Sequence, residues 1–256
     1  MNILVIRFAQ LIESYFFLMK ILTIKTFLMS FIDFASPRRC EICGVYLGES
    51  ERQHEFICED CFDKFPPPIP SELIFDRIKK FYPGEKIIDN AYSLFPATEK
   101  SDIMELIHSM KYRGFSRIGK ELGFELGKLI NVNPNKIYDL IIPVPIHHAR
   151  LRERGFNQSE LISNGIANAL DIPTGFDIIK RARYTQTQTQ LTAQERKKNV
   201  EDVFVPKKVS INLSGKNLLL VDDVFTTGST LYHCAKCLKE MGASQIDTAT
   251  LVFVGS

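Results

Sequence analysis

The sequence lacks the features of secreted, membrane-spanning and disulfide-stabilised proteins. Six cysteines in 256 residues are too few for a disulfide scaffold. Charged residues interrupt the apolar first 34 residues, so no uncharged stretch approaches the roughly 20 residues that a bilayer span requires. No small-residue cleavage site follows, which argues against a secretory signal. We therefore expect a cytoplasmic protein with no membrane span.

Residues 1–35 form an apolar segment ahead of the rest of the chain. Two interpretations of this segment remain open. It is either a helix packed on the domain or an extension upstream of the true start codon. In the second case Met19 and Met29 are alternative starts.

The chain also has little net charge. Its formal charge of +2 does not predict nucleic-acid binding, which would have to come from local basic patches. Hydrophobic residues make up 45% and charged residues 24%, as is ordinary for a globular protein. The length suits one large domain with a small appendage.

Four cysteines fall in two closely spaced pairs, "CEIC" and "CEDC". Four thiolates at this spacing fit a tetrahedral zinc ion, and a short module with little core depends on such a metal to fold. We expect a zinc ribbon over residues 36–66, with structural zinc; redox thiols are the alternative. The expected ligands are Cys40, Cys43, Cys58 and Cys61.

Acidic residues surround these pairs, which argues against DNA at this surface and favours a protein partner. They are Glu41, Glu49, Glu51, Glu55, Glu59 and Asp60. The remaining cysteines, Cys234 and Cys237, lie in a helical stretch, and we expect them to be packing residues.

A proline-rich linker at Phe65–Pro70 precedes the expected main domain, residues 71–256. Residues 71–135 mix helical periodicity with one short strand, and from about residue 136 apolar strands alternate with helices. We expect an α/β fold in which a parallel sheet is flanked by helices, with ligands beyond the carboxyl ends of the strands. Expected strands are "AYSLF", "YDLIIPVP", "KNLLLVDD" and "IDTATLVFV", and expected helices are "SDIMELIHSMKY", "FSRIGKELGFELGKLI", "NQSELISNGIANAL" and "GSTLYHCAKCLKEMG".

One strand ends in two acids followed by a hydroxyl-rich loop, in "LLLVDDVFTTGST". Adjacent carboxylates where a buried strand leaves the sheet can accept hydrogen bonds from a ribose diol or hold Mg²⁺ through water. The small loop and the following helix N-terminus suit a phosphate. The Gly-Lys-Thr/Ser of a Walker loop is missing. The residues are Asp222, Asp223, Thr226, Thr227, Gly228, Ser229 and Thr230.

This stretch resembles the phosphoribosyl-pyrophosphate (PRPP) signature of the type I phosphoribosyltransferases. The resemblance implies that Asp222 and Asp223 contact the ribose hydroxyls and that Thr226–Thr230 cradle the 5-phosphate, with Mg²⁺ bound alongside PRPP. It also implies that the loop carrying Arg150, Arg152 and Arg154 faces the pyrophosphate. If the domain is catalytic, the residues involved are Asp222, Asp223 and Arg154. The alternative for the arginines is a solvated helix face, and His147 and His148 are expected to be ordinary loop residues.

A second basic stretch, Lys180–Phe204, fits a loop that closes over a phosphorylated substrate. The residues expected to act there are Arg183, Thr185, Gln188 and Arg196. The alternative is contact with a nucleic-acid backbone through Arg181, Arg183, Arg196 and Lys197. Only Tyr184 is available for stacking, so support for a single-strand platform is weak.

The order of these motifs after two CxxC pairs resembles the ComF family of late-competence proteins. The shared motifs are "RGFNQ" at Arg154–Gln158, the spaced residues Thr185, Gln188, Leu191, Arg196 and Asn199, and the acid–hydroxyl loop. The resemblance implies a role in DNA uptake during natural transformation, through single-stranded DNA or a helicase partner. The alternatives are an active salvage-type phosphoribosyltransferase and a non-catalytic adaptor with a vestigial pocket.

Overall fold

The chain divides into two compact units, Met1–Phe62 and Asp63–Ser256. The computed structural model describes residues 38–48, 54–98, 101–112, 116–132, 137–182, 203–207 and 211–255. The apolar segment 1–35 lies outside the described residues. The expected linker Phe65–Pro70 follows the division and forms neither helix nor strand. In the described part of the chain, no helix combines the length and the apolar character needed to cross a bilayer.

The described part of the first unit is small and built around its cysteines. Arg39 and Tyr46 form an antiparallel bridge across the turn that contains Gly44, whose φ of +73° favours glycine. The short helix α2 (Glu59–Phe62) begins directly after Cys58. The buried residues in the described part of the first unit are Cys40, Leu47, His54, Ile57, Cys58 and Cys61. Since half of these are cysteines, apolar burial alone gives this unit a very small core.

The second unit contains a four-stranded, fully parallel sheet with the strand order β1-β6-β5-β2. Its strands are β1 (Asn90–Ala97), β2 (Leu140–Pro143), β5 (Asn217–Phe225) and β6 (Gln245–Val254). The two central strands, β5 and β6, are buried over most of their length, as expected for a sheet covered on both faces. This confirms the parallel α/β fold that the sequence predicts.

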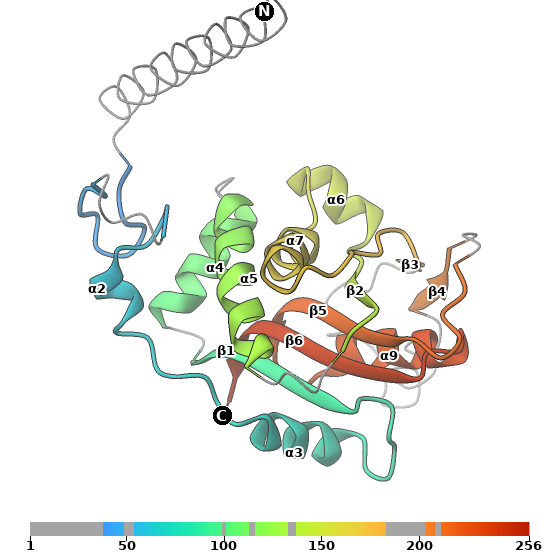
Figure 1. Cartoon of the computed structure of the whole chain (residues 1–256). Helices are drawn as coiled ribbons and strands as arrows, with labels where there is room; N and C mark the ends of the chain where they lie inside the picture. The colour runs from blue at the N-terminus through green and yellow to red at the C-terminus, as the bar shows by residue number, and fades with distance from the viewer. Residues whose placement is uncertain are drawn as a thin grey trace, which may run out of the picture. The chain divides into compact units, whose positions relative to one another are not determined.

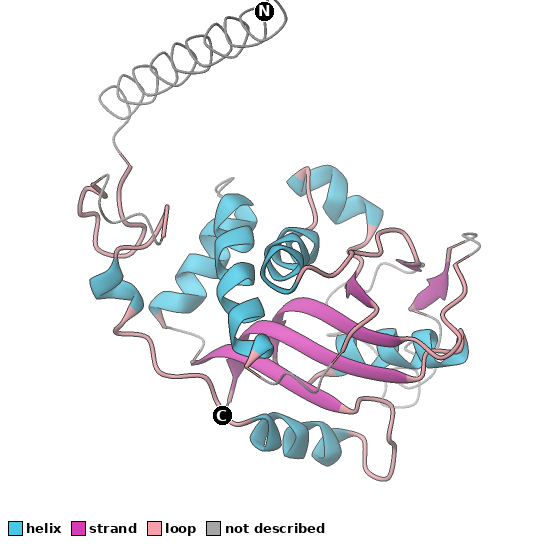
Figure 2. Cartoon of the chain, viewed as in Figure 1, coloured by secondary structure: helices cyan, strands magenta, loops and turns pink. Residues whose placement is uncertain are grey.

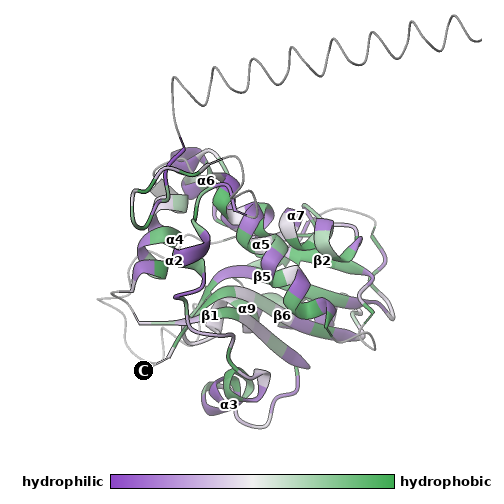
Figure 3. Ribbon diagram, turned by 60° about the vertical axis from the view of Figure 1, so that its left-hand side comes forward, coloured by the Kyte–Doolittle hydropathy of each residue, from purple (hydrophilic) through white to green (hydrophobic). Residues whose placement is uncertain are grey.

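Helices cover both faces of the sheet (Figures 1 and 2). One face packs against α4, α5 and α7. The other packs against α3 and α9, whose buried residues join the strands in one hydrophobic cluster. Each helix has hydrophobic and hydrophilic positions, as Figure 3 shows for α3 and α5. The bounds are α3 Ser71–Phe81, α4 Asp102–Tyr112, α5 Ser116–Asn131, α6 His148–Arg154, α7 Gln158–Leu170 and α9 Ser229–Glu240.

Helices α5 and α7 pack with unusually little space between their backbones. A Cβ atom added to Gly165 would lie 2.1 Å from the carbonyl oxygen of Lys120, and one added to Gly123 would lie 2.3 Å from that of Ile162. Only glycine fits at such backbone contacts. This contact fixes α7, and with it the first turn of α7 at the carboxyl edge of the sheet.

The edge of β2 that faces away from β5 pairs with the chain at one residue only, where Ile141 forms a parallel bridge with Thr174. After Thr174 the chain leaves this edge and forms β3 (Ile179–Arg181), which pairs with β4 (Phe204–Pro206) in a small antiparallel ribbon. The N–H of Ile141 points to this edge, so Pro143 also faces it and has no N–H to continue the pairing. The ribbon packs against α9 and brings Arg181 toward the end of the sheet.

Candidate functional site

The acid pair lies inside β5 and not at its end. The sequence predicts that the strand leaves the sheet at Asp222 and Asp223, but β5 continues to Phe225, which pairs with Phe253 of the long strand β6. On the other side, β2 pairs only as far as Val221. Asp222 is therefore the first residue of β5 that extends past the end of β2, and it is partly exposed. The acids remain at the carboxyl edge of the sheet, where ligands of parallel folds bind.

Asp222 is held by a residue that the sequence did not single out. Ser159, in the first turn of α7, donates a hydrogen bond from its Oγ to Asp222 Oδ1 over 3.0 Å. The backbone N–H of Asp223 donates to the same oxygen, also over 3.0 Å. The local signal for Ser159 is weak: it is one hydroxyl beside the Asn157 N-cap, in a helix that starts at the carboxyl edge.

The hydroxyl loop after β5 has the geometry of an anion-binding helix start. Gly228 is the N-cap of α9, with φ of +74°, and an added Cβ would lie 2.8 Å from the ring of Phe225. Both constraints require glycine. Thr226 and Thr227 are exposed, and Ser229 and Thr230 are partly exposed. Since the first amides of a helix have no intrahelical acceptor, this turn offers N–H groups and a positive dipole end, and the N–H of Ser229 donates to Thr227 Oγ1 over 3.4 Å.

The three arginines after β2 lie on a helix and not on a loop. Helix α6 begins after His147, whose Nδ1 accepts the N–H of Ala149, and it ends at Gly155, with φ of +80°. These caps stabilise a short helix where a loop was expected, and the exposure of Arg150 and Arg152 fits the alternative of a solvated helix face. Arg150 and Arg154 are four residues apart and share one face, which Arg152 does not.

Arg181, which the sequence suggested only for nucleic-acid contact, lies within electrostatic range of Asp222. Burial and then the positive charge of Arg150 lower its pKa, whereas Cys234 and Asp222 act in the opposite direction. Arg181 is partly buried at the end of β3. A cation that is desolvated beside a second cation is stabilised by an anion between them.

The pKa of His147 is also affected by these positive charges. Burial lowers its pKa first, followed by the charges of His148, Arg181, Arg152 and Arg150. The expectation that His147 is an ordinary loop residue was wrong, since it is buried and caps α6. Cationic groups from two distant segments, α6 and the end of β3, therefore lie within electrostatic range of His147.

A cavity of about 240 Å³ adjoins this cluster, between the end of β2, α6 and β3. Its wall includes Pro143, His148, Leu151, Lys180 and Arg181. Asp222 does not line it, whereas Arg181 both lines the cavity and lies within electrostatic range of Asp222. The expected loop residues Arg183, Thr185, Gln188 and Arg196 lie outside the described residues, as do Leu191, Lys197 and Asn199.

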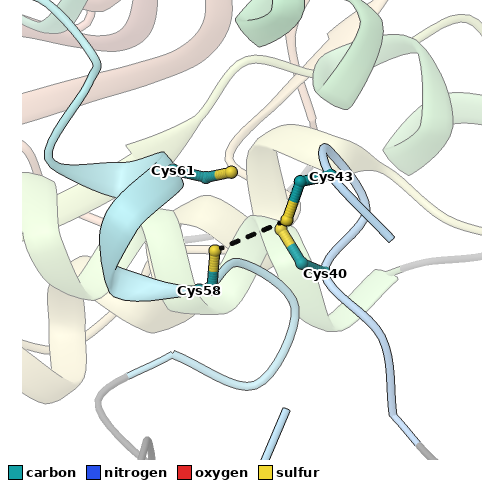
Figure 4. Close-up of side chains that lie close together, drawn as sticks. All are labelled: Cys40, Cys43, Cys58 and Cys61. Carbon is teal, nitrogen blue, oxygen red and sulfur yellow. Dashed lines mark hydrogen bonds between the residues drawn. The ribbon is translucent and has the colours of Figure 1, made fainter. Parts of the chain in front are cut away.

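The four N-terminal cysteines form one cluster, with their sulfur atoms within 4.8 Å of one another (Figure 4). The Sγ atoms of Cys43 and Cys58 are 3.7 Å apart. A tetrahedral zinc ion with Zn–S bonds of about 2.3 Å places its sulfurs roughly 3.8 Å apart, whereas a disulfide requires about 2.05 Å. The cluster thus fits a four-coordinate metal with no open position.

The surroundings of these thiols shift their pKa values in opposite directions. Burial would raise the pKa of Cys40, but backbone N–H groups of Cys43, Cys58 and Ile42 outweigh it and lower the pKa to about 7. Burial raises the pKa values of Cys58 and Cys61.

The other two cysteines, Cys234 and Cys237, are buried in the core of the second unit, as the sequence predicted.

Comparison with known proteins places the chain among phosphoribosyltransferase-like sequences. Residues 157–256 match the family model described as "Phosphoribosyl transferase domain". The match covers α7, β5, the hydroxyl loop, α9 and β6. It supports the expected fold class of the second unit.

Three curated relatives extend the similarity. The DNA utilization protein YhgH of Escherichia coli K12 is 32% identical over 81% of this chain and 86% of its own. The competence protein ComFC of Bacillus subtilis 168 is 28% identical over 83% of this chain and 77% of its own. The competence protein F of Haemophilus influenzae is 40% identical over 43% of this chain, and the match spans 48% of that relative.

Proposed function

Because the chain belongs to the ComF family, we propose that it acts in DNA uptake and that its second unit binds PRPP or another ribose 5-phosphate with Mg²⁺. The relatives named for competence and DNA utilization support the cellular role. The ligand is inferred from the chemistry of the site.

The arrangement at the carboxyl edge carries the ligand proposal. Asp222 and Asp223 provide acceptors for the two ribose hydroxyls, and the turn at Gly228 offers amides to the 5-phosphate. Arg181 lies within electrostatic range of both Asp222 and Arg150, and the positive charge of these two arginines would meet the diphosphate of PRPP. Mg²⁺ would be held by the acids and the ligand's oxygens, and when bound it neutralises phosphate charge.

Phosphoribosyl transfer is the second candidate, and the intact acid–hydroxyl loop favours it. A nucleophile would form a bond to the anomeric carbon while the bond to the pyrophosphate oxygen breaks and pyrophosphate leaves. Arg154 and its neighbours on α6 would stabilise the leaving group. Pyrophosphate release with a panel of nucleobases tests this candidate.

Zinc is the proposed metal of the cysteine cluster. Four cysteines that leave no open position are typical of structural zinc, so we assign the metal to folding and not to chemistry.

The partner in DNA uptake is single-stranded DNA or a helicase. A rise in melting temperature with a short oligonucleotide would identify the first of these.

Calorimetric titration of PRPP with Mg²⁺ tests the ligand proposal. We expect the Asp222→Asn variant to bind about tenfold or more weakly, because hydrogen bonds to charged groups contribute about 1.5–3 kcal/mol. Asp76→Asn, at an exposed acid on α3, is the control and should bind like the wild type. Absence of binding by the wild-type protein would leave the non-catalytic adaptor as the better account.

The same two variants connect the site to the cellular role. In a transformation assay, Asp222→Asn should reduce DNA uptake and Asp76→Asn should not. If an abundant Asp222→Asn protein supports normal uptake, the sugar site does not serve this role.

A further inference from the structure

Two stacked tyrosines join the end of α3 to the first turns of α9, on the same face of the sheet (Figure 1). The ring centroids of Tyr82, the C-cap of α3, and Tyr232 lie 3.7 Å apart, with an interplanar angle of 7°. His233 meets both rings edge-on, and the hydroxyl of Tyr232 donates to Glu85. These contacts fix the plane of the Tyr82 ring.

The end of α3 keeps two aromatic side chains accessible. Tyr232 is buried, whereas Tyr82 stays partly exposed although Tyr232 covers one of its faces. The neighbouring Phe81 is 45% exposed, and the guanidinium carbon of Arg77 lies 5.6 Å from the centroid of its ring. Exposed aromatic rings on a folded domain are costly to leave in water, so they indicate a surface that binds something.

Positive charge surrounds these rings. Two nearby lysines are paired with acids, in Lys79–Asp76 and Lys239–Asp89. Three others are exposed and form no ion pair with any residue that the structure describes: Lys80, Lys86 and Lys236. Lys80 and Lys86 flank Tyr82 in the chain, and Lys236 lies one turn after Tyr232, on the same face of α9.

Accessible rings beside unpaired cations fit a single-stranded nucleic acid. The bases of a single strand can stack on aromatic side chains while its phosphates meet lysines, and every base has a face that can stack. A duplex buries the faces of its bases in its own stack. The sequence predicts that nucleic-acid binding would have to come from a local basic patch, since the net charge is only +2.

We propose that this surface, made of Lys80, Phe81, Tyr82, Lys86 and Lys236, binds single-stranded DNA. Bases stack on the two aromatic rings, and the lysines contact the phosphates. The inference rests on the proposed role in DNA uptake and commits its partner to single-stranded DNA. It does not depend on the proposed sugar-phosphate site.

Fluorescence anisotropy with a labelled oligothymidylate of about 20 nucleotides tests the stacking contacts. Tyr82→Ala and Phe81→Ala should each weaken binding by about fivefold or more, because each removes a ring on which a base stacks. Tyr82→Phe keeps the ring and should bind like the wild type. Neither alanine variant should change the weaker binding of a duplex of the same length.

The dependence of affinity on salt separates the phosphate contacts from stacking. Each phosphate contact of a single strand contributes about 0.7 to the slope of log affinity against log salt concentration. Lys80→Gln should therefore lower this slope by about 0.7. Tyr82→Ala should lower the affinity and leave the slope unchanged.

Helix α5, on the opposite face of the sheet, provides matched controls. Phe124 is 41% exposed, and the Nζ of Lys128 lies 5.6 Å from the centroid of its ring, so it too is an aromatic residue beside a cation. Phe124→Ala and Lys120→Gln should change neither the affinity nor the slope. Thermal unfolding of each variant checks that the fold is intact.

The outcomes separate this inference from the proposal beneath it. If the wild type does not bind the oligonucleotide at low salt, this inference fails and a helicase remains as the proposed partner, whatever the titration with PRPP shows. If it binds and the variants at positions 80, 81 and 82 bind equally well, only this surface is overturned. A loss with Lys80→Gln but not with the ring variants would show a general polyanion surface and contradict base stacking.

Discussion

His147 illustrates how a single side chain can combine structural and electrostatic roles. Its ring is buried, and its Nδ1 accepts the N–H of Ala149 at the start of α6. Protonation at Nδ1 would break this cap, and it would add a charge beside Arg150 and Arg181. Burial and these neighbours therefore lower the pKa of His147, which favours the neutral ring in the folded protein.

This lowered pKa predicts a pH-dependent loss of stability. Below the unfolded-state pKa of about 6.5, the unfolded chain binds a proton that the folded chain resists. The free energy of unfolding should thus fall as the pH drops from about 6.5 through the lower folded-state pKa. Urea unfolding at a series of pH values measures this trend.

Asparagine at position 147 separates the charge from the cap. His147→Asn keeps a good N-cap acceptor and removes the titrating ring. The variant should lose less stability on acidification than the wild type, and both should agree more closely near pH 8. If the free energy of unfolding falls equally with decreasing pH in both proteins, His147 does not contribute to the acid sensitivity.

Residue-level prediction from the sequence succeeded where the relevant contacts are local. The acids and the hydroxyl loop are adjacent in the chain, so "DDVFTTGST" predicts their proximity directly. Ser159 and Arg181 reach Asp222 from two other elements, through helix docking and through the β3–β4 ribbon. Their roles depend on tertiary packing, which has no short sequence signal.

At the scale of elements, the contact between α5 and α7 supports the whole carboxyl edge. Gly119, Gly123 and Gly127 recur every four residues, so they lie on one face of α5. Gly165 of α7 meets this face, with its backbone against Lys120 and Gly123. The contact helps to fix the first turn of α7, where Ser159 donates to Asp222 Oδ1.

Gly165→Ala should destabilise the protein although alanine is the better helix former. The added Cβ would lie 2.1 Å from the carbonyl oxygen of Lys120. To relieve this clash, the backbones of α5 and α7 would have to move apart. Overpacking costs up to about 3 kcal/mol, so we expect a net loss of about 1–2 kcal/mol in the free energy of unfolding. This strain outweighs the roughly 1 kcal/mol that alanine contributes over glycine in a helix. Urea denaturation measures the change.

Gly119→Ala is the control on the same helix pair. Its Cβ would meet the Sδ of Met110 at 2.9 Å and the Cβ of Leu161 at 3.2 Å, so its nearest contacts are side-chain atoms, the first of them in a flexible methionine. The variant should remain close to wild-type stability. Equal stability of the two alanine variants would mean that the backbones can separate without cost.

Most elements of the second unit could be predicted, and the exceptions have physical causes. The strands and long helices have clear apolar periodicity, which reflects the face each one buries. Helix α6 has the sequence "HARLRER", in which no apolar face marks a helix, and its caps at His147 and Gly155 stabilise it. Strand β5 extends past the acids because β6 continues beside it, a partnership that a single segment cannot reveal.

At the scale of the whole molecule, the two units depend on different sources of stability. The second unit buries a large core between its sheet and the helices on both faces. The described part of the first unit buries few apolar side chains besides its cysteines. A module of this kind relies on its metal for folding free energy, so the two units should respond differently to metal removal.

Removal of the metal should therefore unfold the first unit alone. Purified protein should contain zinc, and Cys58→Ser should not, because the variant removes a buried ligand from the cluster. In hydrogen exchange, chelator-treated or Cys58→Ser protein should lose protection over residues 38–62 and retain it in β5 and β6. Cys237→Ser, a control in the core of the second unit, should keep its zinc. Full protection of residues 38–62 in the metal-free protein would show that the cysteine unit folds without a metal.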